Sequence, residues 1–145
     1  MKPDISTELK NCNLYVEEIE AAYHEIAFKL NISDSAMKIL YAICENGESC
    51  LLRDICRHSG LNKQTVNSAL RKLEKKDIIF LVNASTKTKE VFLTDKGKEF
   101  VRNTIFRIIE MEDNIFSSWS KEDIETYTRL SKKFANDLKE RVKNF

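Results

Sequence analysis

The sequence predicts a mainly α-helical protein with one small β-hairpin. Apolar residues recur at helical spacing over most of the chain, and Gly60 interrupts that spacing within a central stretch, residues 49–76. Two short runs of β-branched and aromatic residues follow, at 78–82 and 90–93. The 3.6-residue period indicates helices, whereas short runs of this composition favour strands. We therefore expect helices at both ends of the chain and a hairpin between them.

The first predicted helix runs from Leu9 to Leu30. Its apolar residues are spaced alternately by three and four over three heptads, at Leu9, Cys12, Val16, Ile19, Tyr23, Ile26 and Leu30. This stripe is typical of a helix that packs along another helix. A second helix follows the break at Asn31 and Ser33 and is expected to end at Gly47. Its apolar face consists of Met37, Leu40, Tyr41 and Cys44.

The central stretch predicts two helices joined by a tight turn. The first can end at Gly60, which tolerates a positive φ angle, and Asn62 can cap the second. The side chains expected to face the shared core are Leu52, Ile55, Cys56, Val66, Leu70 and Leu73. Cys56 occupies a position where a small residue lets two helices approach closely, and a buried thiol can fill that role.

A β-hairpin with a flexible, basic tip is expected after the second helix of this pair. The two strand-like runs are separated by the polar segment 83–89, which contains Lys87 and Lys89. After Gly97 we expect one long helix that carries apolar residues from Phe100 to Trp119. The segment Ser120–Asp123 then resembles a capping box that opens a last helix, whose apolar stripe is Ile124, Tyr127, Leu130, Phe134, Leu138 and Val142.

In this order the elements resemble the winged helix-turn-helix of the MarR family. Leu93-Thr94-Asp95-Lys96-Gly97 matches that family's Leu-Thr-x-x-Gly junction between the wing and a long helix. The segment from Leu73 to Ile79 matches its Leu-Glu-x-x-Gly-Leu-Val pattern, with Asp77 in place of the glycine. The resemblance covers almost the whole chain. It implies a transcription regulator that works as a homodimer and places one recognition helix per subunit in the DNA major groove.

The wing departs from the family pattern at one place. The family's Asp-x-Arg would fall on Ser85, Thr86 and Lys87, so the salt link that steadies the wing arginine is absent. The basic contact of the wing is therefore assigned to Lys87, with Lys89 beside it.

The resemblance and the apolar stripes together predict three parts. Residues 1–32 form an N-terminal dimerisation helix, 33–95 a winged helix-turn-helix lobe that binds DNA, and 96–145 the C-terminal dimerisation helices. The stripes at the two ends need a partner, and a second copy of the chain related by a two-fold axis can supply it. A monomer whose end helices fold back on each other is the alternative.

The charge distribution agrees with a DNA-binding lobe. Residues 51–96 contain 10 Lys and Arg against 5 Asp and Glu, whereas the rest of the chain contains 14 against 18. A basic face on an otherwise acidic protein suits phosphate binding. We expect base or near-base contacts from Lys63, Gln64, Asn67, Ser68 and Arg71. Phosphate contacts are expected from Arg53, Thr65, Lys72, Lys87 and Lys89.

The sequence thus predicts a repressor that binds a pseudo-palindromic operator in double-stranded DNA as a homodimer. The rival interpretation is a winged-helix protein-interaction module or antagonist that binds DNA little by itself. An enzyme is not expected, because His24 and His58 lie in separate helices and no glycine-rich phosphate loop is present. No metal site or cofactor is expected either, since the spacing of Cys50, Cys56 and His58 fits no structural zinc pattern. Every apolar run is far shorter than a membrane span, so we expect a cytoplasmic protein without one.

Two kinds of regulatory site remain open. A small aromatic effector could bind between the end helices and the winged lobe, where the candidate lining residues are Tyr15, Tyr23, Phe28, Tyr41 and Phe92. Core packing is the more common role of aromatic residues at helical spacing. Cys12 is the candidate redox-sensitive thiol, because it lies near the start of the first helix with Tyr15 close to the same face. A heptad position also suits an inert, packed thiol.

Overall fold

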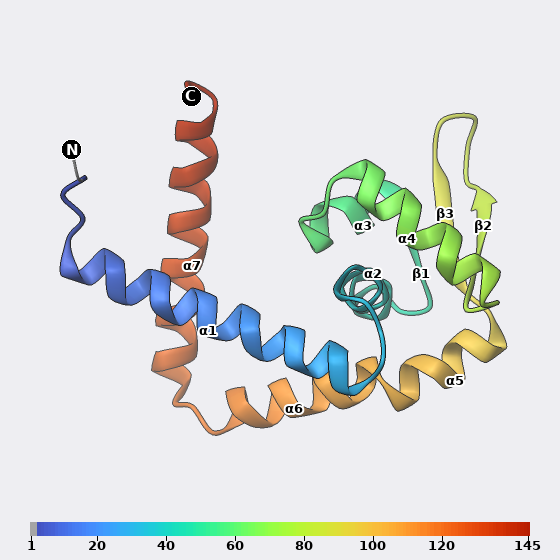
Figure 1. Ribbon diagram of the computed structural model, residues 1–145, viewed down its shortest axis with the longest axis horizontal. Helices are drawn as coiled ribbons and strands as arrows, with labels where there is room; N and C mark the ends of the chain where they lie inside the picture. Colours follow the sequence, from blue (N-terminus) through green and yellow to red (C-terminus); the bar gives the residue numbers. More distant parts are fainter. Residues whose placement is uncertain (1–2) are drawn as a thin grey trace. The chain divides into compact units, whose positions relative to one another are not determined.

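The computed structural model describes residues 3–145, which form two compact units. The first unit extends to Phe106 and the second comprises Arg107–Phe145. The helices of the first unit are α1 (Thr7–Lys29), α2 (Asp34–Glu45), α3 (Leu52–Ser59), α4 (Lys63–Lys75) and α5 (Asp95–Asn103) (Figure 1). Its strands are β1 (Ser49–Leu51), β2 (Ile79–Asn83) and β3 (Lys89–Leu93). Helix α6 (Ile105–Ser117) starts at the end of the first unit, and α7 (Lys121–Val142) belongs to the second.

Helix α2 forms the centre of the first unit. Its side chains Ile39, Leu40 and Ile43 are completely buried, and the helix contacts α1, α3, α4 and β1. Figure 1 shows α2 nearly end-on, with α3 and α4 beside it. The Ser33 hydroxyl caps its start by accepting a hydrogen bond from the backbone N–H of Ala36 at 3.1 Å. Burial on several sides explains why its sequence is apolar around most of the helix rather than along one stripe.

The helix pair of the central stretch is confirmed. Helix α3 ends at Gly60, which has a φ angle of 67°, and the side-chain carbonyl of Asn62 caps α4 by accepting from the backbone N–H of Thr65 at 2.8 Å. Val66, Leu70 and Leu73 are buried as expected. The expectation of a buried Cys56 is wrong, because this thiol is only half-buried and Ile55 alone fills the core from α3.

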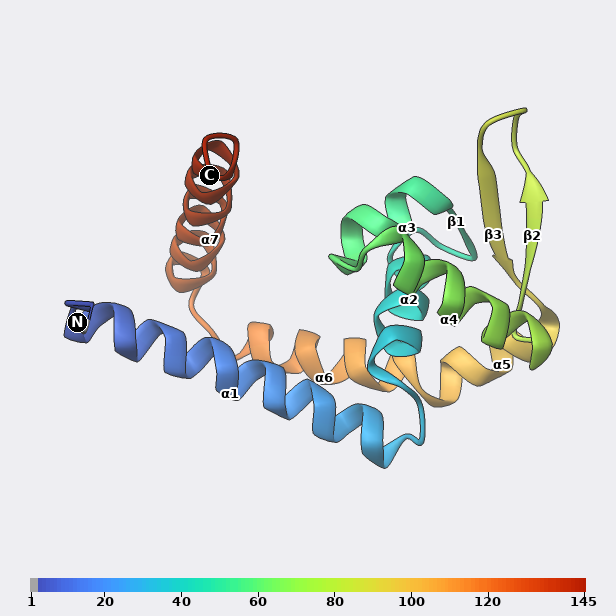
Figure 2. The ribbon, with the colours of Figure 1, turned by 45° about the horizontal axis from the view of Figure 1, so that its top comes forward.

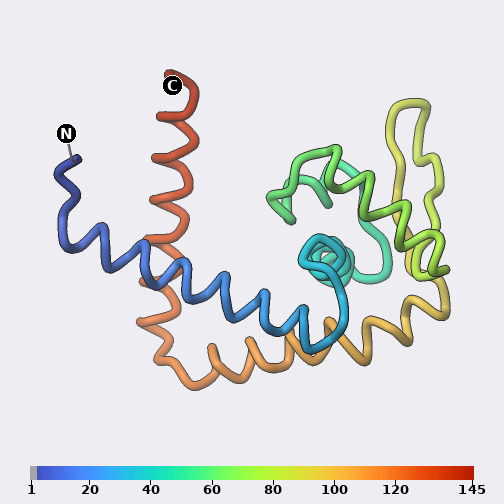
Figure 3. Tube along the Cα trace, in the orientation of Figure 1, coloured from blue at the N-terminus to red at the C-terminus, as the bar shows by residue number. Residues whose placement is uncertain are grey.

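The predicted hairpin is confirmed, but it belongs to a three-stranded antiparallel sheet with the order β1-β3-β2. The sequence interpretation assigned 49–51 to a helix, whereas these residues pair with β3 and set Cys50 opposite Val91. Both side chains are buried on the inner face of the sheet. A three-residue strand is too short to show a period of two, so local pattern gave no signal for it. Figure 3 shows the β2–β3 hairpin projecting from the helices of this unit.

A tight junction joins the end of α4, the wing and α5. Asp77, with a φ angle of 58°, turns the chain out of α4 at the position where the family pattern has glycine. The carbonyl oxygen of Ile78 accepts a hydrogen bond from the backbone N–H of Thr94 at 3.0 Å. The Thr94 hydroxyl accepts from the backbone N–H of Gly97 at 2.8 Å and donates to the carbonyl of Asp77 at 2.6 Å. A Cβ atom on Gly97 would overlap the Ile78 carbonyl oxygen, so this close approach requires glycine.

The expectation of a single long helix after Gly97 is wrong, because the helix is interrupted at Thr104, between α5 and α6. This residue has φ and ψ angles of −127° and −78°, and its hydroxyl donates to the carbonyl of Phe100 at 2.8 Å. A threonine hydroxyl that bonds back to the carbonyl four residues earlier competes with the helical pattern and bends helices. Trp119, which was assigned to the same helix, lies beyond the end of α6.

The second unit is built around an aromatic cluster. The rings of Phe116, Trp119 and Tyr127 pack with centroids 5.0 to 6.2 Å apart, which joins the end of α6 to the first turns of α7. The predicted cap of α7 is confirmed, because the Ser120 hydroxyl accepts from the backbone N–H of Asp123 at 3.0 Å. No residue of α7 is buried in this single chain.

We expect Gly97→Ala to destabilise the protein by at least about 2 kcal/mol, because the added methyl group meets backbone rather than a movable side chain. Gly60→Ala is the matched control: no atom lies within 4 Å of the new Cβ, and only the positive φ angle is unfavourable, which costs about 1 kcal/mol. Urea unfolding at one protein concentration compares the two. An equal or smaller loss for Gly97→Ala would contradict the steric explanation.

Candidate nucleic-acid interface

The outward face of α4 presents a continuous set of hydrogen-bonding side chains. Val66, Ala69 and Leu70 hold one face of α4 in the core, so the side chains on the opposite face of the helix must point away from the core. Lys63, Gln64, Ser68, Arg71 and Lys72 are exposed there, and Thr65 and Asn67 are half-buried. The helix thus brings all seven of its candidate DNA-contacting residues together on its solvent side. Arg53 is also exposed, in the first turn of α3.

The tip of the wing is closed by its own hydroxyl groups. The side-chain oxygens of Ser85 and Thr88 lie 2.7 Å apart, and the backbone N–H of Lys87 donates to the Ser85 hydroxyl at 3.3 Å. The backbone N–H of Ala84 donates to the Thr88 carbonyl at 2.9 Å. The bonds made by Ser85 and Lys87 lie at positions that correspond to the family's Asp-x-Arg, which this sequence lacks. The tip is therefore a hydrogen-bonded turn rather than an open loop. We call the Ser85–Thr88 contact the hydroxyl clasp; Lys87 and Lys89 beside it are exposed.

The base of the wing is tied to the rest of the sheet. The Ser49 hydroxyl donates to the Glu90 carboxylate at 2.8 Å, which links β1 to β3. Phe80 and Phe92 stack across β2 and β3 with ring centroids 5.3 Å apart and an angle of 14° between the rings. The wing is therefore fixed to the helices at its base and closed at its tip.

The lysines and arginines of this surface form no ion pair with the acidic residues that the structure describes. Within residues 3–145, every ion pair formed by a Lys or Arg lies outside the basic segment 51–96. Outside this segment, for example, the Lys98 amine lies 2.8 Å from the Glu48 carboxylate, and this carboxylate raises the pKa of the Lys98 amine. Positive charge that is not neutralised inside the protein remains available to an external anion such as a phosphate. The segment is therefore electrostatically suited to a polyanion.

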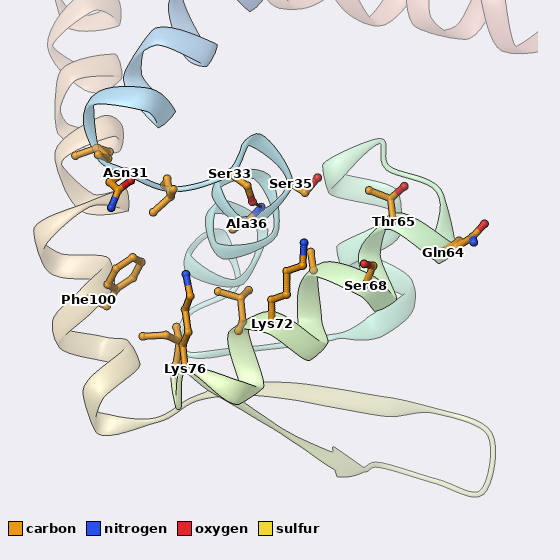
Figure 4. A pocket seen from close by; sticks show the side chains of 15 residues that line it. Asn31, Ser33, Ser35, Ala36, Gln64, Thr65, Ser68, Lys72, Lys76 and Phe100 are labelled. Carbon is orange, nitrogen blue, oxygen red and sulfur yellow. Dashed lines mark hydrogen bonds between the residues drawn. The ribbon is translucent and has the colours of Figure 1, made fainter.

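Sequence reasoning missed a groove beside the recognition face. A cavity of about 680 Å³ lies between the 30–33 connection, the first turn of α2, one side of α4 and Phe100 of α5 (Figure 4). Four of the candidate DNA-contacting residues line it: Gln64, Thr65, Ser68 and Lys72. Lys76, which was not assigned a role, lines it as well. No local signal could have identified this site, because its walls come from four segments that only the tertiary fold brings together.

The five aromatic residues proposed for an effector site do not line this groove. Tyr15 and Phe28 are on α1 and are 61 % and 82 % exposed in the single chain. Tyr23 and Tyr41 are half-buried, and Phe92 is occupied in the stack with Phe80. An effector site made by these residues stays a prediction.

The four cysteines differ in accessibility. Burial raises the pKa of the Cys44 thiol to about 11, and burial together with Asp54, Glu90 and Glu45 raises that of Cys50 to about 11 as well. Both thiols therefore resist forming the reactive thiolate. Cys12 is exposed on α1, so it is the most accessible candidate for redox chemistry, and that role stays a prediction.

The two histidines have carboxylate neighbours on other helices. His24 Nδ1 lies 2.7 Å from Asp34, and His58 Nδ1 lies 3.6 Å from Glu45. No cluster of three or more metal-ligating side chains occurs in the part of the chain that the structure describes. In the same part, no helix has the length and apolar character needed to cross a membrane.

Comparisons with known proteins agree with this geometry. Residues 25–87 match the MarR family model. A MarR family regulator from Neisseria meningitidis has the same fold, with a TM-score of 0.83, 16% identity, and 96% of this chain and 99% of that chain covered. The S. aureus MepR–DNA complex gives a TM-score of 0.68 and 21% identity, with coverage of 93% and 99%. Bordetella bronchiseptica BpsR, described as regulated in its DNA binding by 6-hydroxynicotinic acid, has a TM-score of 0.64 and 14% identity. The match covers 86% of this chain and 98% of that chain.

No curated protein sequence matches the chain. Residues 25–87, which span the helix-turn-helix and most of the wing, are similar to the MarR family of regulators, and the chain shares its winged helix-turn-helix fold with solved structures of that family.

Proposed function

We propose that the protein is a homodimeric repressor that binds a pseudo-palindromic operator in double-stranded DNA. The observation that carries the proposal is the exposed face of α4 together with the wing, where no Lys or Arg is paired with an acidic residue in the described chain. Phosphate binding by such cations releases counterions, which supplies affinity for any duplex. The MepR structure, which contains DNA, has the same fold. Occupying an operator is sufficient to block a promoter, so the activity needs only DNA binding and dimerisation.

Within this proposal the side chains divide into two groups. Lys63, Gln64, Asn67, Ser68 and Arg71 lie along the outward face of α4, which can enter the major groove and reach base edges. Arg53, Thr65, Lys72, Lys87 and Lys89 hold the phosphate backbone on either side. Base contacts discriminate between sequences, whereas phosphate contacts fix position and depend on salt.

The proposed dimer rests on uncovered apolar surface in both units. Tyr127, Leu130, Phe134, Leu138 and Val142 form a stripe along α7, and each is between 48 % and 65 % exposed. On α1, Leu9, Val16 and Ile19 are similarly uncovered, at 46 % to 56 %. Apolar stripes of this length on two separate helices are typical of helices that pack against a partner. A symmetric dimer also supplies the two recognition helices that a pseudo-palindromic operator needs.

The dimer is tested by light scattering coupled to size exclusion at micromolar concentration. We expect the native chain to be a dimer and Phe134→Glu to dissociate it, because a charge then faces the partner's apolar stripe. Asn136→Glu is the matched control, since it introduces the same charge two residues along α7, away from the stripe, and should leave the dimer intact. A monomeric native chain would contradict the proposal.

The division between base and phosphate contacts is tested by comparing a selected operator with random duplex. Arg71→Ala or Asn67→Ala should weaken binding to the operator by about 1–3 kcal/mol and affect random duplex less, because a lost base contact removes discrimination. Replacing both Lys87 and Lys89 by Ala should weaken binding to all sequences alike and lower the salt slope by about two units. Equal losses on both duplexes for Arg71→Ala and Asn67→Ala would overturn the assignment. A native chain without salt-dependent DNA binding would favour the protein-interaction module instead.

The hydroxyl clasp is expected to position Lys87 for phosphate contact. Ser85→Ala removes the clasp and the hydrogen bond from the Lys87 backbone but leaves every charge in place. We therefore expect weaker binding to all duplexes and a salt slope lowered by up to about one unit. The neighbouring Thr86→Ala is the control, because the Thr86 side chain takes no part in the clasp. If both variants bind DNA like the native chain, the clasp has no role in positioning Lys87.

A further inference from the structure

Strand β2 forms an open edge of the sheet within the part of the chain that the structure describes. It is the last strand in the order β1-β3-β2, and its main contacts are with β3 and α4. Figure 2 shows no other element of the first unit beside its outer edge. Proteins usually protect such an edge with a lysine, a proline or a bulge, because an open strand pairs readily with another chain. Residues 79–83 contain neither lysine nor proline, and they pair with β3 without interruption.

The hydrogen bonds of the hairpin identify the backbone groups on this edge. At its two ends, the N–H of Thr94 donates to the carbonyl of Ile78 and the N–H of Ala84 donates to the carbonyl of Thr88. Hydrogen-bonded pairs alternate along an antiparallel ladder, so the even-numbered residues of β2 bond to β3. The N–H and C=O groups of the odd-numbered residues therefore point away from the sheet. These residues are Ile79, Leu81 and Asn83.

The same strand exposes an apolar face. Phe80 and Val82 are 44 % and 45 % exposed, and Phe80 stacks on Phe92 of β3. From Ile78 to Thr86 the sequence contains no charged residue. We propose that the free edge of β2 pairs antiparallel with β2 of a second copy of the chain about a two-fold axis, which joins the two sheets into one.

One register of this pairing uses every outward backbone group. If Leu81 lies opposite Leu81 of the second copy, then Ile79 lies opposite Asn83, and these pairs exchange both hydrogen bonds. Phe80 then lies beside Val82 of the second copy at a position where side chains approach closely, and pairs of aromatic and β-branched residues stabilise sheets there. A strand that complements itself in hydrogen bonds and in side chains fits a second copy better than an unrelated peptide.

The paired edge is separate from the other proposed surfaces. The residues proposed to contact DNA lie on α3, on α4 and in the segment 87–89 of the wing, and none belongs to 79–83. The apolar stripes proposed for the homodimer lie on α1 and α7. Pairing through β2 therefore joins one homodimer to another without using either surface, a consequence that rests on the proposed function.

The association is expected to be weak and to respond to salt. An interface of one strand pair belongs to the small, transient class, below roughly 1,200 Å². The register also places the tip of one wing, with Lys87, beside the start of β2 in the other copy, where Lys75 and Lys76 precede Asp77. The lysines outnumber the aspartate, so the two ends repel each other until salt screens them. Pairing should therefore strengthen as ionic strength rises, whereas DNA binding weakens.

The first arm of the test traps the pair in its register by disulfide formation. It uses the full-length chain with Cys12→Ser, which removes the exposed native thiol. One version carries Phe80→Cys and another carries Val82→Cys, and oxidation is followed for each version alone and for an equimolar mixture. Peptide mass spectrometry identifies the linked residues. We expect the mixture to form the 80–82 disulfide at least about fivefold faster than either version links to itself, because only this pair lies side by side.

The second arm measures association by sedimentation velocity over a series of protein and salt concentrations. It compares the native chain with Asn83→Pro and its matched control Asn83→Ala. Both variants lose the exposed Asn83 side chain, but only proline removes the outward N–H, and this N–H takes no part in the ladder with β3. We expect the native chain to associate beyond the homodimer, increasingly so at higher salt. Asn83→Pro should weaken this association at least about fivefold, since each pair loses two hydrogen bonds, and Asn83→Ala should change it little.

The proposal is overturned if the native chain shows no such association, which would leave the edge to a foreign peptide. Equal rates of disulfide formation in the mixture and in the single versions would also overturn it, as would equal effects of Asn83→Pro and Asn83→Ala. Both arms contain no DNA, and the disulfide is read on the wing itself. Failure of the wing pairing is therefore distinguishable from failure of DNA binding or of the homodimer.

Discussion

The close contact of Gly97 with the Ile78 carbonyl is the constraint on which the candidate DNA surface depends. Three elements meet there: the chain leaves α4 through Asp77, β2 begins one residue after Ile78, and α5 starts beneath the Thr94 cap. The amine of Lys96 adds a hydrogen bond to the carbonyl of Lys76, the last residue before this turn. The orientation of the wing relative to α4 is therefore set by hydrogen bonds to backbone groups, made by the Thr94 backbone and by the Thr94 and Lys96 side chains, which are short and directional.

The helices and the wing could be predicted from sequence because their signals are local. Gly60 and Asn62 mark the turn between α3 and α4 by well-understood backbone preferences, and both have the expected conformations. Strand β1 could not be predicted, since it exists only through pairing with β3 about forty residues later. The break at Thr104 was missed for a different reason, because a threonine within an apolar helical pattern looks like an ordinary surface position until its hydroxyl bond is seen.

The candidate site divides in the same way. The outward face of α4 followed from helical periodicity once Val66, Leu70 and Leu73 were assigned to the core. The groove beside α4 could not be predicted from the sequence. The absence of ion pairs between the basic segment and the described carboxylates could not be predicted either. Charge counts show that residues 51–96 are basic, but only coordinates show that no acidic side chain of the described chain has turned to neutralise their lysines and arginines. Such isolation disfavours compaction slightly, a cost expected at a surface selected for binding rather than for stability.

The hydroxyl clasp has a consequence for the wing under changing solution conditions. A carboxylate–guanidinium link weakens when salt screens it and disappears when the carboxylate is protonated. Two neutral hydroxyl groups respond to neither change, so the turn formed by Ser85 and Thr88 keeps its geometry over a wide range of ionic strength and acidity. In this protein the wing can act as a fixed structural element, so changes of ionic strength would alter the proposed DNA contact through counterions rather than through the shape of the wing.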